Sequence, residues 1–291
     1  MEYKHLQVQR SESANTLVGF IAERLKFSKK KAKALLDQRC VFVNGHRIWM
    51  ARHELQDGDK VEITTGVEVT PQIDDSMILF QDNNLLIANK PPGILSNGPK
   101  SFEKALRIFL SRADPREKYG QLSGESATLT AVHRLDKDTS GCLLFAKNID
   151  VKSRLILLFS QKSICKIYHA VANGKITKTK LTVTKPIEGK TALSSIQVLD
   201  ANRLATYARI IIETGRTHQI RKHLNHLHHP IIGDKTYATN RHVSPLELDV
   251  HRQMLHAYQL IFKHPVNGKS IKCTAPIPDD FRQCLKQYHL K

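Results

Sequence analysis

Apolar positions follow two different rhythms along this chain. Near the N-terminus they recur every three or four residues, at Leu17, Phe20, Ile21 and Leu25. This spacing predicts an amphipathic helix, and Ser28 is a favourable N-cap for a second helix over 29–36. A short apolar run at 41–43 stands before an Asn-Gly pair and predicts a strand that ends in a hairpin turn. Together these elements predict a compact domain over residues 1–66.

From residue 77 onward, short runs rich in Ile, Val, Leu, Thr and Tyr predict strands. The runs lie at 77–80, 85–88, 143–146, 167–172, 195–199, 206–212 and 259–263. Helical spacing occurs between them, at 102–110, 151–159 and 217–227. Because strands outnumber helices and do not alternate with them one for one, we predict an α+β fold with a mixed, largely antiparallel sheet. This domain covers 77–291, and the segment 67–76, which contains a proline and little periodicity, is the predicted linker.

The net charge indicates the class of partner. The 291 residues include 45 Lys and Arg against 27 Asp and Glu, a difference of +18. An excess of this size predicts attraction to a polyanion, with phosphate contacts and salt-dependent binding. The alternative is a basic protein that its charge merely keeps soluble.

Cysteine usage and hydropathy limit the compartment. Five cysteines without a Cys-x-x-Cys spacing argue against a disulfide framework or structural zinc and favour a reducing cytosol. The apolar runs, such as 155–159, are too short to span a bilayer, and the first ten residues do not resemble a signal peptide. We therefore expect a cytoplasmic protein with no membrane partner.

The nonapeptide 133–141, His-Arg-Leu-Asp-Lys-Asp-Thr-Ser-Gly, places a carboxylate between cations just before a turn. Strand-like runs at 129–132 and 142–146 flank it. An Asp in this position can simply cap the turn through its side-chain oxygen. A carboxylate can also act as a nucleophile or as a base. Asp136 is therefore a candidate for chemistry, with turn capping as the alternative.

Three further segments carry polar residues in recognisable contexts. Residues 89–96, Asn-Lys-Pro-Pro-Gly-Ile-Leu-Ser, predict a strand that ends in a rigid turn. Residues 166–171, Lys-Ile-Tyr-His-Ala-Val, predict an alternating strand, in which Tyr168 is either functional or a core tyrosine with a satisfied hydroxyl. Residues 214–224 predict the start of a helix, with Thr217 as its N-cap.

In their order along the chain, the four motifs resemble those of the RluA family of RNA pseudouridine synthases, and the resemblance covers nearly the whole chain. It implies that the protein isomerises uridine in RNA with Asp136 as the nucleophile. It also implies that Arg134 helps to displace the target base and that Arg216 pairs with Asp136. Attack on the sugar and attack on the base both remain open. Because the reaction is an isomerisation, it implies no metal, nucleotide or redox cofactor.

The same resemblance assigns three supporting residues. Tyr168 stacks on the flipped uracil, and such stacking contributes about 1–3 kcal/mol per base. Ile220 packs against the base. Lys90 supports the floor of the active site. Five histidines between 218 and 229 could suggest a metal site, but their spacing is poor for a shared ligand set, so we expect none.

The first 66 residues resemble the small RNA-binding domain first known from ribosomal protein S-four. The segments Arg-Cys-Val-Phe-Val-Asn-Gly and Leu-Gln-Asp-Gly-Asp-Lys-Val-Glu-Ile match best. In that domain the second helix and the loop after it contact RNA. The corresponding candidates here are Lys29, Lys30, Lys33 and Arg39.

Several alternatives remain at this point. The predicted partner is RNA, with ribosomal RNA favoured because the appended RNA-binding domain occurs mostly with ribosomal targets, and transfer RNA as the alternative. A catalytically silent RNA-binding or ribosome-assembly protein would share the fold but not need Asp136, Tyr168 and Arg216 together. A nucleoside or glycoside hydrolase would need paired carboxylates, for which Asp138 is the only nearby partner. The family leads us to expect a monomer.

Overall fold

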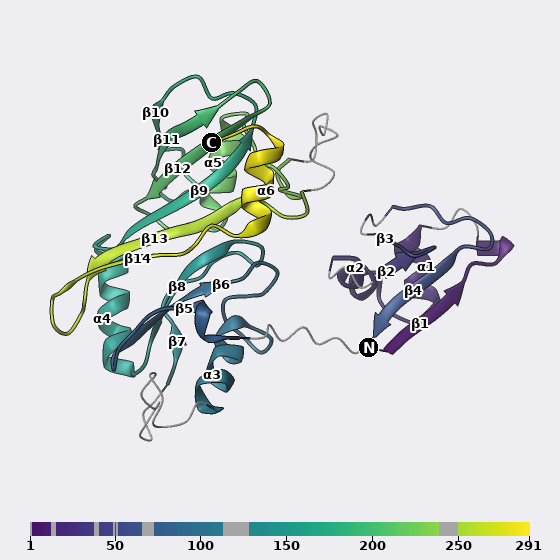
Figure 1. The fold of residues 1–291 in the computed structure, drawn as a ribbon, viewed down its shortest axis with the longest axis horizontal. Coiled ribbons are helices and arrows are strands. Elements are labelled where there is room, and N and C mark those ends of the chain that lie inside the picture. Colours follow the sequence, from purple (N-terminus) through teal and green to yellow (C-terminus); the bar gives the residue numbers. More distant parts are fainter. Residues whose placement is uncertain are drawn as a thin grey trace. The chain divides into compact units, whose positions relative to one another are not determined.

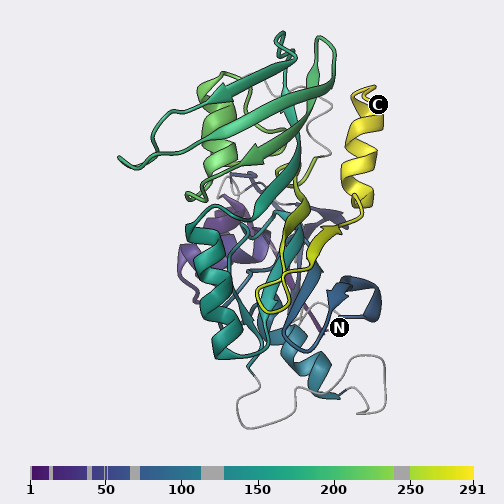
Figure 2. The same cartoon turned by 90° about the vertical axis from the view of Figure 1, so that its left-hand side faces the viewer.

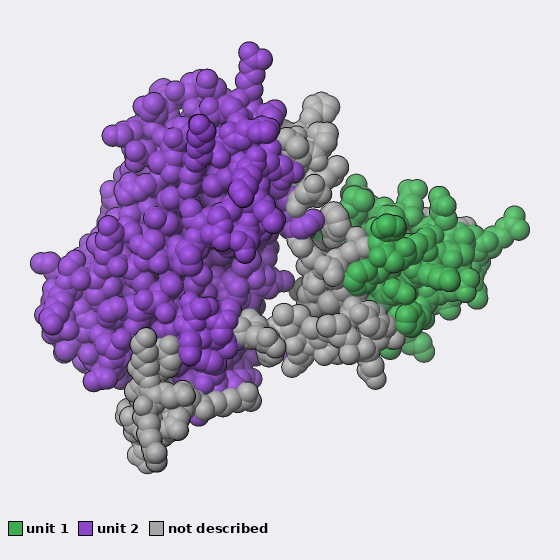
Figure 3. Space-filling model, in the orientation of Figure 1, with its two compact units in different colours: residues 1–70 green, residues 71–291 purple. Residues whose placement is uncertain are grey.

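The chain forms two compact units, Met1–Thr70 and Pro71–Lys291, which Figure 3 colours separately. The computed structural model describes residues 2–12, 16–37, 41–48, 50, 52–65, 73–112, 128–238 and 250–291. Within these residues each unit has its own sheet and its own hydrophobic core. No described helix is long and apolar enough to cross a bilayer.

The first unit joins short helices to a small sheet. Its elements are β1 (Glu2–Gln7), η1 (Arg10–Glu12), α1 (Leu17–Arg24), α2 (Lys29–Asp37), β2 (Val41–Val43), β3 (His46–Arg47) and β4 (Lys60–Thr65). The strands pair in the order β1-β4-β2-β3. The apolar positions that predicted α1 are buried, with Leu17, Phe20 and Ile21 at most 1% exposed. The predicted helices and strand of this unit are therefore confirmed.

The second unit is built on a large sheet. Its strands are β5 (Ile78–Gln81), β6 (Leu85–Lys90), β7 (Thr130–Ala131), β8 (Ser140–Ala146), β9 (Cys165–Asn173), β10 (Lys180–Val183), β11 (Ser194–Ala201), β12 (Ala205–Ile212), β13 (Leu255–Lys263) and β14 (Ser270–Thr274). Figure 1 shows them running from β10 at one end to β5 at the other. The path is β10-β11-β12-β9-β13-β8-β6-β5, with β14 and β7 paired at its side.

Strand direction confirms the predicted fold class. Among the described residues the pairings of this sheet are antiparallel except one, the short parallel contact between β13 and β8. In that contact His256 lies opposite Ser140, and Ala257 opposite Gly141. The protein is therefore α+β with a mixed, largely antiparallel sheet. The parallel contact joins β8, which follows the nonapeptide, to the C-terminal part of the chain.

Helices cover both faces of the sheet. They are η2 (Asp75–Met77), α3 (Phe102–Arg112), α4 (Ile149–Ser160), α5 (Gln219–His226) and α6 (Asp279–Gln287). Alternate residues of β6 divide between two cores, because Leu86 packs in the cluster of α3 and Leu85 in the cluster of α4. Figure 2 shows α5 and α6 on opposite sides of the other half of the sheet. Strand β9 is thus covered on both faces, and its seven central residues are buried.

Gly141 permits the parallel contact between β8 and β13. Its φ is +113°, and a Cβ atom there would lie 2.2 Å from the carbonyl oxygen of Ala257. The backbone of β13 would have to move away from β8 to accept any side chain. Gly268, in the turn between β13 and β14, also has a positive φ of +69°, but no atom lies within 4 Å of its would-be Cβ.

We therefore expect Gly141→Ala to destabilise the second unit more than Gly268→Ala. The left-handed backbone alone costs about 1–2 kcal/mol, and at Gly141 the backbone clash adds to that cost. Calorimetric unfolding of the full chain measures both variants. Equal losses of stability would contradict the close approach of the two strands.

Candidate active site

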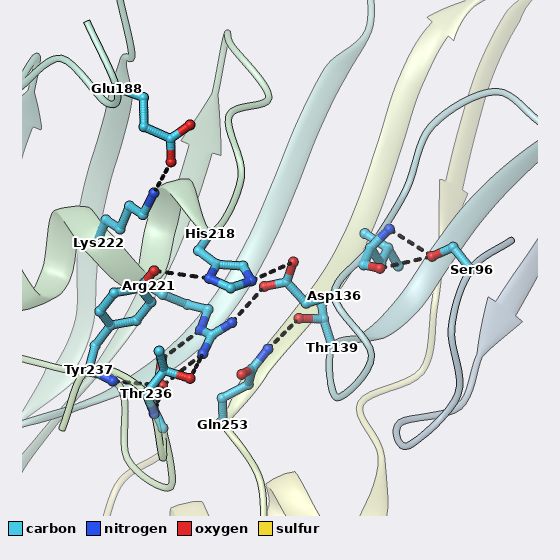
Figure 4. Close-up of polar contacts among 12 residues, drawn as sticks. Ser96, Asp136, Thr139, Glu188, His218, Arg221, Lys222, Thr236, Tyr237 and Gln253 are labelled. Carbon is cyan, nitrogen blue, oxygen red and sulfur yellow. Dashed lines mark hydrogen bonds and ion pairs between the residues drawn. The ribbon is translucent and has the colours of Figure 1, made fainter. Parts of the chain in front are cut away.

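The residues 136–139 form a tight turn just before β8. The Thr139 N–H donates to the Asp136 carbonyl oxygen over 3.1 Å, so the backbone closes the turn. The Asp136 carboxylate instead contacts Arg221 and faces His218, as Figure 4 shows. Its side chain is 22% exposed, so solvent and a ligand can reach it. This geometry favours a chemical role for Asp136 over the turn-capping alternative.

Contacts from two segments, one before and one far after the turn in sequence, fix the chain around Asp136. Ser96 both accepts from the Leu135 N–H (2.8 Å) and donates to the Leu135 carbonyl (2.9 Å). Arg252 Nη1 donates to the Asp138 carbonyl over 3.1 Å. Gln253 donates to Thr139 Oγ1 over 2.9 Å, a bond visible in Figure 4. The carboxylate is therefore carried on a loop whose neighbouring residues are each held in place.

Lys90, at the end of β6, binds the backbone of the same loop. Its ammonium group is fully buried and donates to the carbonyls of Pro91 (2.8 Å), Ile94 (2.8 Å) and Lys137 (3.0 Å). Three acceptors match the three N–H donors of an ammonium. Burial nevertheless lowers the pKa of Lys90 to about 7, opposed chiefly by the charge of Asp138. Lys90 thus ties the Pro-Pro-Gly turn to the turn of Asp136.

Arg221, on α5, connects the Asp136 carboxylate to a second carboxylate. Its Nη1 donates to Asp136 Oδ2 over 3.2 Å. Its Nε and Nη2 form a bidentate pair with Asp234, at 2.6 and 2.8 Å. The Asp234 side chain is fully buried and that of Arg221 is 6% exposed. Arg221 also lies over the Tyr237 ring, 5.1 Å from its centroid.

This arrangement differs from the expected one, because Arg221 and not Arg216 pairs with Asp136. Arg216 is exposed and lies before α5, where its Nε donates to the Thr191 carbonyl over 3.0 Å. The helix begins at Gln219, and its N-cap is His218 in the left-handed region (φ 56°), so the predicted cap Thr217 was also wrong. The later start directs Arg221, rather than Arg216, toward the loop of Asp136.

His218 faces the other oxygen of the carboxylate. Its Nε2 lies 3.8 Å from Asp136 Oδ1, beyond hydrogen-bond distance. Its Nδ1 is 3.0 Å from Tyr237 Oη. Burial lowers the pKa of His218, and the positive charges of Arg221 and Lys222 act in the same direction. His218 is therefore a neutral imidazole near pH 7.

Of the remaining predicted residues of the second unit, two are buried and one is exposed. Tyr168, on β9, is 8% exposed, and burial together with the charge of Asp136 raises the pKa of its hydroxyl. Tyr168 thus keeps its proton and belongs to the same electrostatic site as Asp136. Ile220 is 4% exposed within the main hydrophobic core. Arg134 is exposed beside the turn, where it can meet a large ligand.

The basic candidates of the first unit lie on α2 and the loop after it. Lys29 and Lys33 are exposed. The Lys30 side chain and Arg39 lie outside the described part of the structure.

Sequence reasoning missed Arg221, Asp234, His218 and Tyr237 as members of the site. One signal was available, because Asp234 is the only acid between Glu213 and Glu247 in a strongly basic segment. A single buried carboxylate needs a cationic partner. Nothing in the sequence specified which of the neighbouring cations that partner is. In the part of the chain that the structure describes, no three potential ligands among His, Cys, Asp and Glu come together as a metal site.

Comparisons with known proteins identify what this chain is similar to. A family model described as RNA pseudouridylate synthase matches residues 84–226. The ribosomal large subunit pseudouridine synthase D of Haemophilus ducreyi is 31% identical over 89% of this chain and 86% of its own length. An uncharacterized RNA pseudouridine synthase of Bacillus subtilis, YhcT, is 29% identical over 97% of this chain and 96% of its own length.

A solved structure supports the fold. Human RNA pseudouridylate synthase domain containing protein 4 superimposes with a TM-score of 0.60 at 23% identity. The alignment covers 74% of this chain and 93% of that one.

The two arginines should differ in their importance for stability. Arg221→Gln leaves the buried Asp234 carboxylate without its cation, so we expect the free energy of unfolding to fall by about 3 kcal/mol. Arg216→Gln removes one exposed hydrogen bond and should cost less than about 1 kcal/mol. Calorimetric unfolding of both variants tests this order. Similar losses would contradict the central position of Arg221.

Proposed function

Because this chain belongs to the RNA pseudouridine synthases of the RluA type, we propose that it isomerises specific uridines of large-subunit ribosomal RNA with Asp136 as the nucleophile. The observation that supports the role of Asp136 is its contact with Arg221. One carboxylate oxygen is held by a guanidinium that Asp234 already fixes, and the side chain remains partly exposed.

The reaction balances without any co-reactant. The bond between nitrogen 1 of uracil and carbon 1′ of ribose breaks, the base rotates, and carbon 5 bonds to carbon 1′. Carbon 5 loses a proton and nitrogen 1 gains one. Asp136 attacks the nucleoside and is released again before the product leaves, while its carboxylate stays paired with Arg221 between turnovers. This proposal covers attack on the sugar and attack on the base alike.

Two further residues are proposed to handle the base. A uridine within folded RNA must leave its stack before Asp136 can reach it, at a cost of a few kcal/mol. Arg134 is exposed beside the turn and is long and cationic, so it suits a role in displacing the base. Tyr168 suits a stacking role, since its ring lies close enough to Asp136 for that charge to act on its hydroxyl.

The proposed target rests on the relatives and on the first unit. The Haemophilus ducreyi relative is named for the large ribosomal subunit and aligns with 89% of this chain. The first unit has its own core and sheet and carries Lys29 and Lys33 exposed on α2. We propose that it is an S-four-like anchor for RNA, in which these lysines contact phosphates. A ribosomal substrate fits a protein that acts in the cytoplasm.

Asp136→Asn should abolish turnover while leaving the fold and RNA binding intact. The amide is nearly isosteric with the carboxylate but is not a nucleophile. The assay is release of tritium from carbon 5 of labelled uridine in large-subunit ribosomal RNA, with calorimetric unfolding and a binding isotherm beside it. Asp138→Asn is the matched control, because Asp138 lies two residues away and its carbonyl is held by Arg252.

Three outcomes would contradict parts of this proposal. Retained turnover in Asp136→Asn would reject Asp136 as the nucleophile. Tritium release from transfer RNA alone would reject the ribosomal target but not the reaction. Free uracil as the product, lost equally in Asp136→Asn and Asp138→Asn, would instead indicate a hydrolase with paired carboxylates.

A further inference from the structure

His218 and Tyr237 complete a closed set of contacts around the Asp136 carboxylate (Figure 4). Arg221 contacts Asp136 Oδ2 and lies over the Tyr237 ring. Tyr237 reaches Nδ1 of His218, and His218 Nε2 faces Asp136 Oδ1. The two rings meet edge to face, with centroids 5.7 Å apart. Arg221 thus contacts one oxygen of the carboxylate, and His218 faces the other.

Electrostatics selects one tautomer of the imidazole. A neutral imidazole carries its proton on either Nδ1 or Nε2. With the proton on Nδ1, the Nε2 lone pair would face the negative charge of Asp136. With the proton on Nε2, that N–H points toward Asp136 Oδ1 and Nδ1 accepts from the Tyr237 hydroxyl. The second tautomer is favourable at both nitrogens, so the Tyr237 hydroxyl fixes the proton on the side of Asp136.

The backbone of His218 also argues for a role other than helix capping. His218 occupies the N-cap position of α5, where Ser, Thr, Asp or Asn would bond the first turn. Its side chain makes no cap bond, and its φ of 56° is unusual for a residue other than glycine. A strained residue that does not cap its helix, with its ring facing a carboxylate, is typical of a functional position.

From this geometry we propose that His218 is a positioning residue for Asp136 and that Tyr237 acts by setting its tautomer. The proposal rests on the proposed function of Asp136. Arg221 fixes Oδ2, and the Nε2–H of His218 limits rotation of the carboxylate by attracting Oδ1. Because the imidazole is neutral, it orients the nucleophile without cancelling its charge. No proton passes through His218 in this role.

The role depends on the neutral form of His218. The charged and titratable groups around the imidazole are Asp136, Glu188, Arg221, Lys222, Asp234 and Tyr237. Protonation would convert the contact into an ion pair with Asp136 and weaken the nucleophile. Activity should therefore fall as the pH drops through the pKa of His218, which burial sets below its ordinary value of 6.5.

Two substitutions of His218 test whether a neutral N–H donor facing Asp136 is what matters at this position. In His218→Gln the amide nitrogen takes the place of Nε2, so the neutral donor toward Asp136 is kept. In His218→Asn the amide ends where Nδ1 was and does not reach Asp136. We expect kcat to fall about tenfold in His218→Asn, which loses the attraction of the Nε2–H for Asp136 Oδ1, and clearly less in His218→Gln, with KM nearly unchanged in both.

His228 offers the matched control. It lies just after the C-terminal end of α5, is exposed, and also has a positive φ of 66°. Asn tolerates this backbone better than Gln. If His218 served only the fold, Asn would lower stability and activity less than Gln at position 218, just as Asn lowers stability less than Gln at position 228. Calorimetric unfolding of the same two substitutions at His228 compares Asn and Gln at a left-handed position outside the site.

Tyr237→Phe tests the tautomer argument. The ring that lies under Arg221 is kept, but the donor to Nδ1 is lost. Losing that donor removes stabilisation of the neutral imidazole, so its pKa rises and the acid limb of the kcat–pH profile should move to higher pH. The shift should vanish when His218→Gln is also present, because glutamine does not titrate.

The outcomes distinguish this inference from the proposed function. An active wild type with inactive Asp136→Asn supports the nucleophile. Under those conditions, equal kcat for His218→Asn and wild type, or an unmoved acid limb in Tyr237→Phe, would overturn the roles of His218 and Tyr237 alone. An active Asp136→Asn variant would instead overturn the premise for both.

Discussion

The guanidinium of Arg221 is the interaction on which the rest of the site depends. Three of its contacts run to the carboxylates of Asp234 and Asp136, and Asp234 is fully buried. A buried carboxylate without a cation costs several kcal/mol, so the structure requires Arg221 at this place for stability alone. Because Asp234 fixes the guanidinium, Arg221 also places a positive charge beside one oxygen of Asp136. Arg221 therefore serves both the stability of the fold and the proposed chemistry.

Hydrogen bonds from four side chains hold the turn of Asp136 in place. Ser96, Lys90, Arg252 and Gln253 come from segments far apart in the sequence, yet each bonds a different residue of the turn or its flanks. Because these bonds go mostly to the backbone, the Asp136 side chain is left to Arg221 and His218. A carboxylate on a firmly held loop needs little reorganisation before it reacts.

The sequence predicted local features better than side-chain partners. Helix α1 and strands β6, β8 and β9 followed from periodicity, because burial on one or both faces leaves a clear pattern. The short edge strand β10 did not, since half-exposed residues carry little pattern. The motifs predicted Asp136 and Tyr168 to share a site, and in the structure the charge of Asp136 acts on the Tyr168 hydroxyl. They assigned the ion pair to Arg216, because the start of α5 at Gln219 depends on a left-handed His218 that sequence does not reveal.

The central claim is that the shape of Arg221, and not only its charge, organises the nucleophile. Lysine keeps the charge, but its compact ammonium lacks the planar fork that pairs bidentately with Asp234 while a third N–H donor reaches Asp136. The most direct test is the single-turnover rate of tritium release by Arg221→Lys, with Arg216→Lys as its control. We predict a rate about a hundredfold below wild type, the effect of losing roughly 3 kcal/mol at the reacting carboxylate, and a near-normal rate for the control. A rate for Arg221→Lys within about threefold of wild type, under 1 kcal/mol, would contradict the account.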